Sequence, residues 1–383
     1  MVTKRARTWL ARGTLITVLA IISTLGIGTW ALSGGVASEL LLPSDPDSLV
    51  TVIAVDARSV TITADARTVL PGVWGLATDH GAATLGDVVV ADATSVRRAL
   101  LDRSGVITVG AAAAFQRIVY RPDPEAVGVP FTEVILEGPI GEVSAWTTTG
   151  TDDTWVVFIH DFGVDGTEAL RVIEFFADLG LPVIVPALRT DVAVAEGGRR
   201  TADLGSAGWR DLIPALDFAI ASGAEDIVLF GSGTGASSAL LAATDPRYSA
   251  HIAALVLDGP LLDPADVADR HLAEVKVPGF LGSWAKGVAT FRFGIDWAGL
   301  DHLTAAAGQT LPVLIFHGDG DDRYPVAASE AYAATAPEVT LVVVPGAGHG
   351  ETWNVDPEGY QEALEAFLTA TVVGPADIVV PEA

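Results

Sequence analysis

Cysteine is absent from the 383 residues, and lysine is scarce, with three lysines in the whole chain. The lack of cysteine excludes disulfide bonds, a thiol nucleophile and thiolate metal sites. Basic residues are few overall, because 22 Lys and Arg stand against 48 Asp and Glu, which gives a formal net charge of −26. Such a surface repels phosphate backbones, so we expect no nucleic-acid partner. No motif predicts a cofactor or a bound metal.

The first 39 residues combine a basic flank with a long uncharged run. The run extends over Gly13–Ser38 and is preceded by four basic side chains, Lys4, Arg5, Arg7 and Arg12. It exceeds the roughly 20 helical residues that cross a bilayer. Because a basic flank stays in the cytoplasm, we predict a single-pass signal anchor over residues 1–39. The membrane is then a partner, and the bulk of the chain lies outside the cytoplasm.

A cleaved signal peptide is the alternative for this segment. Gly35 and Ala37 supply small residues for a cleavage site, although the uncharged run is longer than the roughly 7–15 apolar residues of a signal peptide. The protein would then be secreted.

Short β-branched runs separated by Gly, Pro and Asp follow a Pro/Asp linker at residues 40–48. They predict a small antiparallel β module over residues 49–122, and no catalytic constellation occurs within it. A larger domain is predicted over residues 123–370, followed by a tail at 371–383.

Apolar strands alternate with helical stretches in the larger domain. Runs such as WVVFIH, DIVLFG and PVLIFHG are continuously apolar, which is typical of a parallel sheet covered on both faces. We therefore predict the α/β class, with a doubly wound, mostly parallel sheet. Residues 260–311 interrupt the alternation with a mixed, aromatic segment that is placed as a cap over the strand ends.

Distinctive loops follow four of these strands, at the edge where α/β sheets bind ligands. The small-residue turn Gly231–Gly235 (GSGTG) follows DIVLF, and HGDGDDRYP, which contains Asp321, follows PVLIF. PGAGH, which ends at His349, follows TLVVV, and HDFG, which begins at His160, follows WVVFI.

In this order, these loops resemble the nucleophile elbow, the acid turn, the histidine loop and the oxyanion loop of the α/β-hydrolase family. The resemblance runs from about residue 123 to 368. The phrase GAGHGETWNVDP, together with WRD at 209–211, is similar to a membrane-anchored bacterial subgroup with an N-terminal β module. It implies serine-hydrolase ancestry, with ester or amide acyl transfer to water. Asp321 and His349 would be the acid and base of a triad, and the N–H groups of Phe162 and Thr234 would form the oxyanion hole.

Two departures oppose the usual mechanism. Gly233 takes the position of the nucleophilic serine and has no oxygen to offer the histidine. Asp161 replaces a glycine at the second position of the oxyanion motif, where a carboxylate opposes a developing negative charge. Ser232 as a substitute nucleophile requires a remodelled elbow, because it lies one residue early. A water activated by His349 and Asp321 is a further alternative.

Other polar residues at the strand ends have competing interpretations. Asp258 also ends an apolar strand and competes with Asp321 for the role of acid. His160 and His317 lie just inside their strands, and we interpret them as structural.

Three functions remain open from the sequence. The first is a hydrolase-family protein that is impaired or inactive by the usual mechanism. The second is an active esterase, lipase-like or peptidase-like hydrolase that uses Ser232 or a water. The third is a pseudo-hydrolase that binds an acyl ligand, a peptide ligand or a partner protein. A purely structural envelope protein ranks below these.

Overall fold

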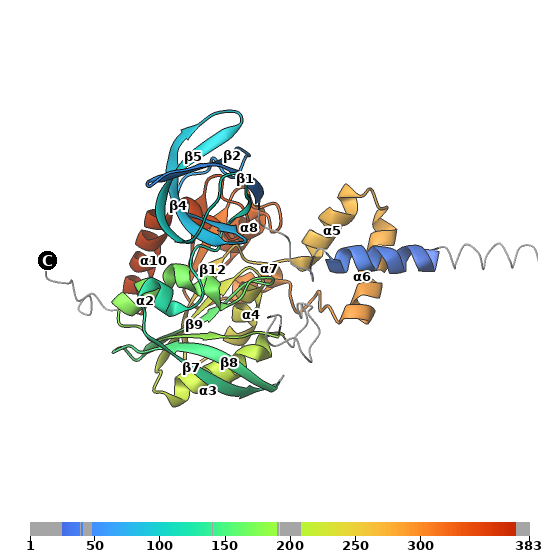
Figure 1. Cartoon of the computed structure of the whole chain (residues 1–383). Coiled ribbons are helices and arrows are strands. Elements are labelled where there is room, and N and C mark those ends of the chain that lie inside the picture. Colours follow the sequence, from blue (N-terminus) through green and yellow to red (C-terminus); the bar gives the residue numbers. More distant parts are fainter. Residues whose placement is uncertain are drawn as a thin grey trace, which may run out of the picture.

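The computed structural model describes residues 25–38, 40, 48–139, 141–189, 191 and 208–372. These residues form a small β-barrel, a large α/β domain and a helical cap that projects from it (Figure 1). The linker at 41–47, most of the expected anchor at 1–24 and the tail from 373 lie outside the described residues.

The N-terminal module is a closed, antiparallel barrel in the strand order β1-β2-β5-β4-β3-β6. Its strands are β1 (Ser48–Val55), β2 (Ser59–Thr63), β3 (Trp74–Thr78), β4 (Gly81–Ala91), β5 (Ser95–Gly105) and β6 (Ala112–Gln116). Most buried strand positions are apolar, as the alternation of the sequence requires, although Arg98 of β5 is also fully buried. The rings of Trp74 and Phe115 stack inside the barrel with their centroids 5.0 Å apart. The prediction of a β module is confirmed.

The larger domain contains an eight-stranded sheet in the order β14-β13-β12-β11-β9-β10-β8-β7. Its strands are β7 (Phe131–Gly138), β8 (Gly141–Thr148), β9 (Thr154–Ile159), β10 (Val183–Pro186), β11 (Asp226–Ser232), β12 (Ile252–Asp258), β13 (Val313–Gly318) and β14 (Val339–Val344). The six strands from β14 to β10 are parallel, and the hairpin of β7 and β8 pairs antiparallel at the edge.

Helices cover both faces of this sheet, which confirms the predicted doubly wound architecture. The α-helices are α2 (Leu170–Asp178), α3 (Ile213–Ala221), α4 (Thr234–Ala243), α5 (Pro264–Glu274), α6 (Gly279–Phe293), α7 (His302–Ala305), α8 (Val326–Thr335), α9 (Thr352–Val355) and α10 (Pro357–Thr371). The 3-10 turns are η1 (Pro124–Val127), η2 (Gly166–Ala169), η3 (Gly208–Leu212) and η4 (Ala306–Gly308). One apolar core lies under α3 and α4, and the other lies under α2 and α10.

The cap consists of α5 and α6, and the N-terminal helix packs against it (Figure 1). Residues 25–38 and 40 are helical, and Val36 and Leu40 are fully buried in the apolar core of the cap. The Arg292 guanidinium donates to the carbonyl of Trp30 at 2.7 Å and lies 3.9 Å from the Trp30 ring centroid. None of the described helices is long and apolar enough to cross a bilayer.

Candidate active site

The elbow has the backbone of a nucleophile turn although its central residue is glycine. β11 ends at Ser232, α4 begins at Thr234, and Gly233 between them has φ +53° and ψ −112°. L-residues rarely adopt this conformation. Gly231 and Gly235 are needed for close packing, because an added Cβ would lie 2.5 Å from the Cα of Ala236 and 2.3 Å from the carbonyl oxygen of Ile159, respectively.

Asp321 is the acid that the structure places against the histidine loop. Its Oδ2 lies 2.8 Å from His349 Nδ1, and its Oδ1 accepts from the backbone N–H groups of Arg323 and Tyr324 at 2.9 and 2.8 Å. Asp258, the competing candidate, instead forms an ion pair with Arg171 at 2.8 Å and accepts from the Thr352 hydroxyl at 2.7 Å. Asp321 alone of the two therefore holds the imidazole.

Asp161 occupies the volume that a serine side chain would fill. A Cβ built on Gly233 would lie 2.0 Å from Asp161 Oδ1 and 2.2 Å from its Cγ. The other carboxylate oxygen, Oδ2, lies 2.9 Å from His349 Nε2, the atom that accepts the serine proton in a triad. The site is therefore an Asp–His–Asp arrangement, in which a carboxylate from the loop after β9 stands in for the missing hydroxyl.

The same carboxylate uses the donors expected to stabilise an oxyanion. The Thr234 N–H donates to Asp161 Oδ1 at 2.8 Å, and the Thr234 hydroxyl donates to the same oxygen at 3.1 Å. The Phe162 N–H donates to the Thr234 hydroxyl oxygen at 3.1 Å. The sequence predicts that Asp161 would oppose an oxyanion; in the structure Asp161 binds in the hole itself.

A buried charge network from the barrel side neutralises this carboxylate. Arg117, which follows β6, places its guanidinium nitrogens 3.5 Å from Asp161 Oδ2 and 3.2 Å from Glu168 Oε1. Glu168 also accepts from the Asp161 N–H at 2.8 Å and from the Ser232 hydroxyl at 3.0 Å. All four side chains are buried.

Ser232 is therefore not brought to the histidine. Its hydroxyl donates to Glu168, and it belongs to the network rather than to a triad. Sequence reasoning missed Arg117 and Glu168, because neither lies in a recognisable motif. Arg117 belongs to a module that shows no catalytic pattern. A faint signal for Glu168 is its place one turn into the helical segment that follows the oxyanion loop.

The two strand-end histidines make structural contacts. His317 Nδ1 lies 2.7 Å from the Ser329 hydroxyl. His160 Nε2 lies 3.1 Å from Asp191 Oδ1. Burial alone would lower the pKa of His160, but the charge and hydrogen bond of Asp191, the hydrogen bond with the Asp161 backbone and the charge of Glu168 together raise that pKa to about 9.

The pKa of His349 is raised for the same kind of reason. Burial lowers it, but the charge of Asp321 and the hydrogen bonds with Asp161 and Asp321 raise it to about 9. Burial would raise the pKa of Asp161, whereas its hydrogen bond and charge interaction with His349 hold that pKa well below its usual range. His349 is thus an imidazolium at neutral pH, which cannot accept a proton from a nucleophile.

This assignment predicts a loss of stability at alkaline pH. A pKa raised from 6.5 to about 9 stabilises the fold fully below pH 6.5, and the contribution disappears as the pH rises through 9. His160 contributes in the same pH window and remains in the His349→Gln variant. Because this variant lacks the contribution of His349, it should lose less stability between pH 6.5 and 9.5 than the native chain, although it should still lose some. Thermal unfolding at both pH values measures this, and equal losses in the two proteins would contradict the assignment.

No group of three or more His, Asp or Glu side chains suited to a metal ion occurs in the described ranges.

The chain is similar to one domain family and to a mycobacterial protein. A domain of unknown function (DUF8805) matches residues 51–116, which is the barrel. The uncharacterized protein Rv2307c of Mycobacterium tuberculosis strain H37Rv is 32% identical over 152 residues, which are 38% of this chain and 46% of that protein. The chain thus spans about half the length of this curated relative.

Solved structures match the larger domain. The esterase Pf2001 of Pyrococcus furiosus superposes with a TM-score of 0.51 at 19% identity, covering 66% of this chain and 96% of the esterase. A second crystal form of that esterase gives a TM-score of 0.51 at 20% identity, with coverage of 66% and 95%. At this identity the likeness concerns the fold, and this chain has the α/β-hydrolase fold.

Proposed function

We propose that this chain is a pseudo-hydrolase, a binding protein on an α/β-hydrolase fold, held at the outer face of a membrane by its N-terminal segment. One observation carries the proposal: the Asp161 carboxylate fills the place of the serine side chain and accepts the hydrogen bonds of the elbow. The basic flank and uncharged run at the N-terminus support the membrane attachment.

The chemistry of acyl transfer requires three things that this site lacks. An oxygen on the elbow must attack, a neutral imidazole must accept its proton, and free N–H donors must stabilise the oxyanion. Gly233 has no oxygen, His349 is charged, and the Thr234 N–H is already bonded. A carboxylate can itself be a nucleophile, but Asp161 is 1% exposed and both of its oxygens are engaged.

A fluorophosphonate probe tests the proposal, because it labels an activated serine whatever the substrate is. We expect no labelling of the native chain and no hydrolysis of short-chain p-nitrophenyl esters above the His349→Ala variant. The Pyrococcus furiosus esterase is a suitable positive control for both assays.

The pattern of any activity would identify the mechanism that replaces our proposal. Labelling that disappears in Ser232→Ala would establish a shifted serine nucleophile. Turnover without labelling that disappears in His349→Ala would establish a water activated by the histidine. Turnover lost in Asp161→Asn and retained in Ser232→Ala would make Asp161 the nucleophile.

A further inference from the structure

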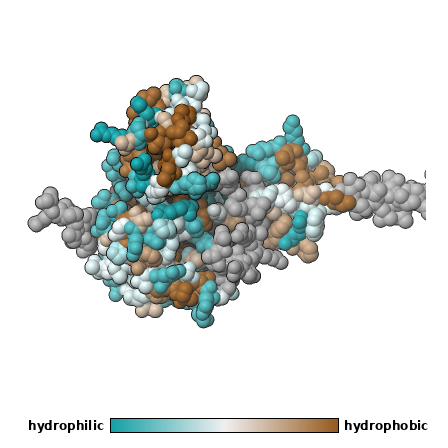
Figure 2. Space-filling view, in the orientation of Figure 1, coloured by the Kyte–Doolittle hydropathy of each residue, from teal (hydrophilic) through white to brown (hydrophobic). Residues whose placement is uncertain are grey.

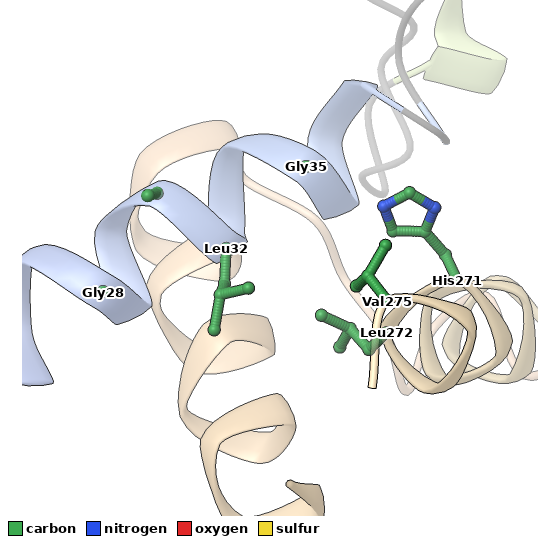
Figure 3. Close-up of a pocket in the computed structure, with 7 residues that line it drawn as sticks. Gly28, Leu32, Gly35, His271, Leu272 and Val275 are labelled. Carbon is green, nitrogen blue, oxygen red and sulfur yellow. The ribbon is translucent and has the colours of Figure 1, made fainter. Parts of the chain in front are cut away.

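An apolar cavity lies between the N-terminal helix and α5, outside the elbow and its charge network. Its volume is about 560 Å³, within the range of small-molecule sites. The helix contributes Gly28, Ala31, Leu32 and Gly35, and the other wall consists of His271 and Leu272 of α5 and Val275 directly after it. Figure 3 shows Leu32, Leu272 and Val275 pointing into the space between the two helices. The small residues of the helix leave this space, and its lining suits a hydrocarbon chain.

The N-terminal helix and the cap, whose α5 lines the cavity, both expose apolar side chains. The helix exposes Ile27 and Trp30, which are 72% and 54% exposed. The cap exposes a larger set, namely Val275, Phe280, Trp284 and Phe291. Hydrophobic surface accordingly gathers on the cap and the N-terminal helix in Figure 2. Trp and Phe exposed beside an apolar helix are typical of a protein face at the membrane–water interface.

The course of the N-terminal segment indicates that the exposed apolar side of the cap meets a lipid bilayer. The helical wall of the cavity lies within the uncharged run Gly13–Ser38, and four basic residues precede that run. Val36 and Ala37 at the other end of the run, and Leu40 just after it, are buried in the cap. A segment that crosses a bilayer must therefore leave it near the cavity, because protein covers the helix beyond that point.

We infer that the cavity binds one acyl chain of a bilayer lipid, with the cap lying against the outer leaflet. This inference rests on the proposed membrane attachment but not on the absence of hydrolysis. The headgroup should be zwitterionic rather than anionic, since the chain carries a net charge of −26.

The test uses the full chain in phosphatidylcholine vesicles that contain a phosphatidylcholine with a diazirine in its acyl chain. After irradiation, mass spectrometry locates the labelled peptides. We expect label on residues 271–275 of α5. Gly28→Leu should reduce that label about tenfold or more, because its side chain fills the cavity. Gly26→Leu is the matched control, since it lies on the same helix outside the cavity lining, and an added Cβ meets nothing within 4 Å at either position.

The outcomes separate the cavity from the attachment and from the chemistry. A chain that does not float with the vesicles would overturn the membrane attachment and the lipid site together. A floating chain without label on 271–275, or with label unchanged by Gly28→Leu, would overturn the lipid site alone. The esterase and fluorophosphonate assays are unaffected by all of these results.

Discussion

Serine at position 233 together with glycine at position 161 should give this chain an esterase activity that neither change gives alone. Gly233→Ser alone places a Cβ 2.0 Å from Asp161 Oδ1, so the new side chain and the carboxylate compete for one volume. Asp161→Gly alone frees the Thr234 N–H and His349 but supplies no oxygen. Only the double variant leaves a hydroxyl, a histidine and an acid in contact.

The expected size of the effect follows from the two groups that Asp161 occupies, the Thr234 N–H and His349 Nε2. Recovery of one oxyanion donor is worth about 100-fold to 1,000-fold in kcat, and members of a triad act as a unit. The double variant should therefore hydrolyse p-nitrophenyl butyrate at least about 100-fold faster than either single variant. Removal of the carboxylate also lets the pKa of His349 fall toward its ordinary value, so the rate should rise through pH 6 to 8 rather than near pH 9.

The matched control is the double variant Asp161→Gly, Gly233→Ala. It has the same Cβ at position 233 as the serine variant but lacks the hydroxyl group. The gained activity must disappear on addition of His349→Ala. Activity of Gly233→Ser equal to that of the double variant would show that Asp161 does not block the site. An inactive, folded double variant would show that the elbow and the Asp321–His349 pair are not aligned for attack.

Loss of the Arg117 guanidinium should cause the largest loss of stability among single changes in the network. Arg117→Met retains most of the apolar stem and leaves the buried carboxylates of Asp161 and Glu168 without their shared cation. Breaking a buried ion pair costs about 3–5 kcal/mol. We expect the lower end of this range, because Arg171 remains 3.7 Å from Glu168 and His349 remains bonded to Asp161.

Urea denaturation of the full chain in detergent, followed by tryptophan fluorescence, measures this loss. Arg97→Met is the matched control, since Arg97 is exposed on β5 of the same barrel and should change the free energy of unfolding by less than about 0.5 kcal/mol. Equal effects of the two substitutions would mean that Arg117 does not compensate the buried carboxylates. The Asp161→Asn background should reduce the cost of Arg117→Met, because one of the two charges is then absent.

The sequence is enough to place Asp321 beside His349, but it does not indicate where the Asp161 side chain lies. Asp321 and His349 lie in short motifs whose position follows from the end of a parallel strand, so local pattern is enough to place them. The orientation of Asp161 depends on Arg117, which comes from another module. It also depends on Glu168, whose relation to the elbow exists only after folding. The sequence shows a carboxylate where the oxyanion loop is expected to have glycine, but it does not show that the Arg117 guanidinium stabilises this carboxylate.

The N-terminal run illustrates a second limit of sequence reasoning. Hydropathy shows that burial of residues 13–38 is favourable, but it does not distinguish burial in a bilayer from burial in a protein core. In the fold, the end of the run serves the cap: Val36 and Ala37 belong to the same apolar core as Leu261 and Leu272. Hydropathy therefore assigns the whole segment to a membrane anchor, although its last residues, such as Val36 and Ala37, belong to the core of the cap.

This packing has a consequence for the lifetime of the protein. Proteolysis at Ser38 would remove Val36 and Ala37 together with the proposed anchor and leave their apolar neighbours in the cap facing water. A chain cut there would expose an apolar patch on the cap, and such patches promote aggregation and recognition by cellular quality control. The proposed membrane attachment and the integrity of the cap therefore depend on the same N-terminal segment, so cleavage at Ser38 would leave a less stable cap.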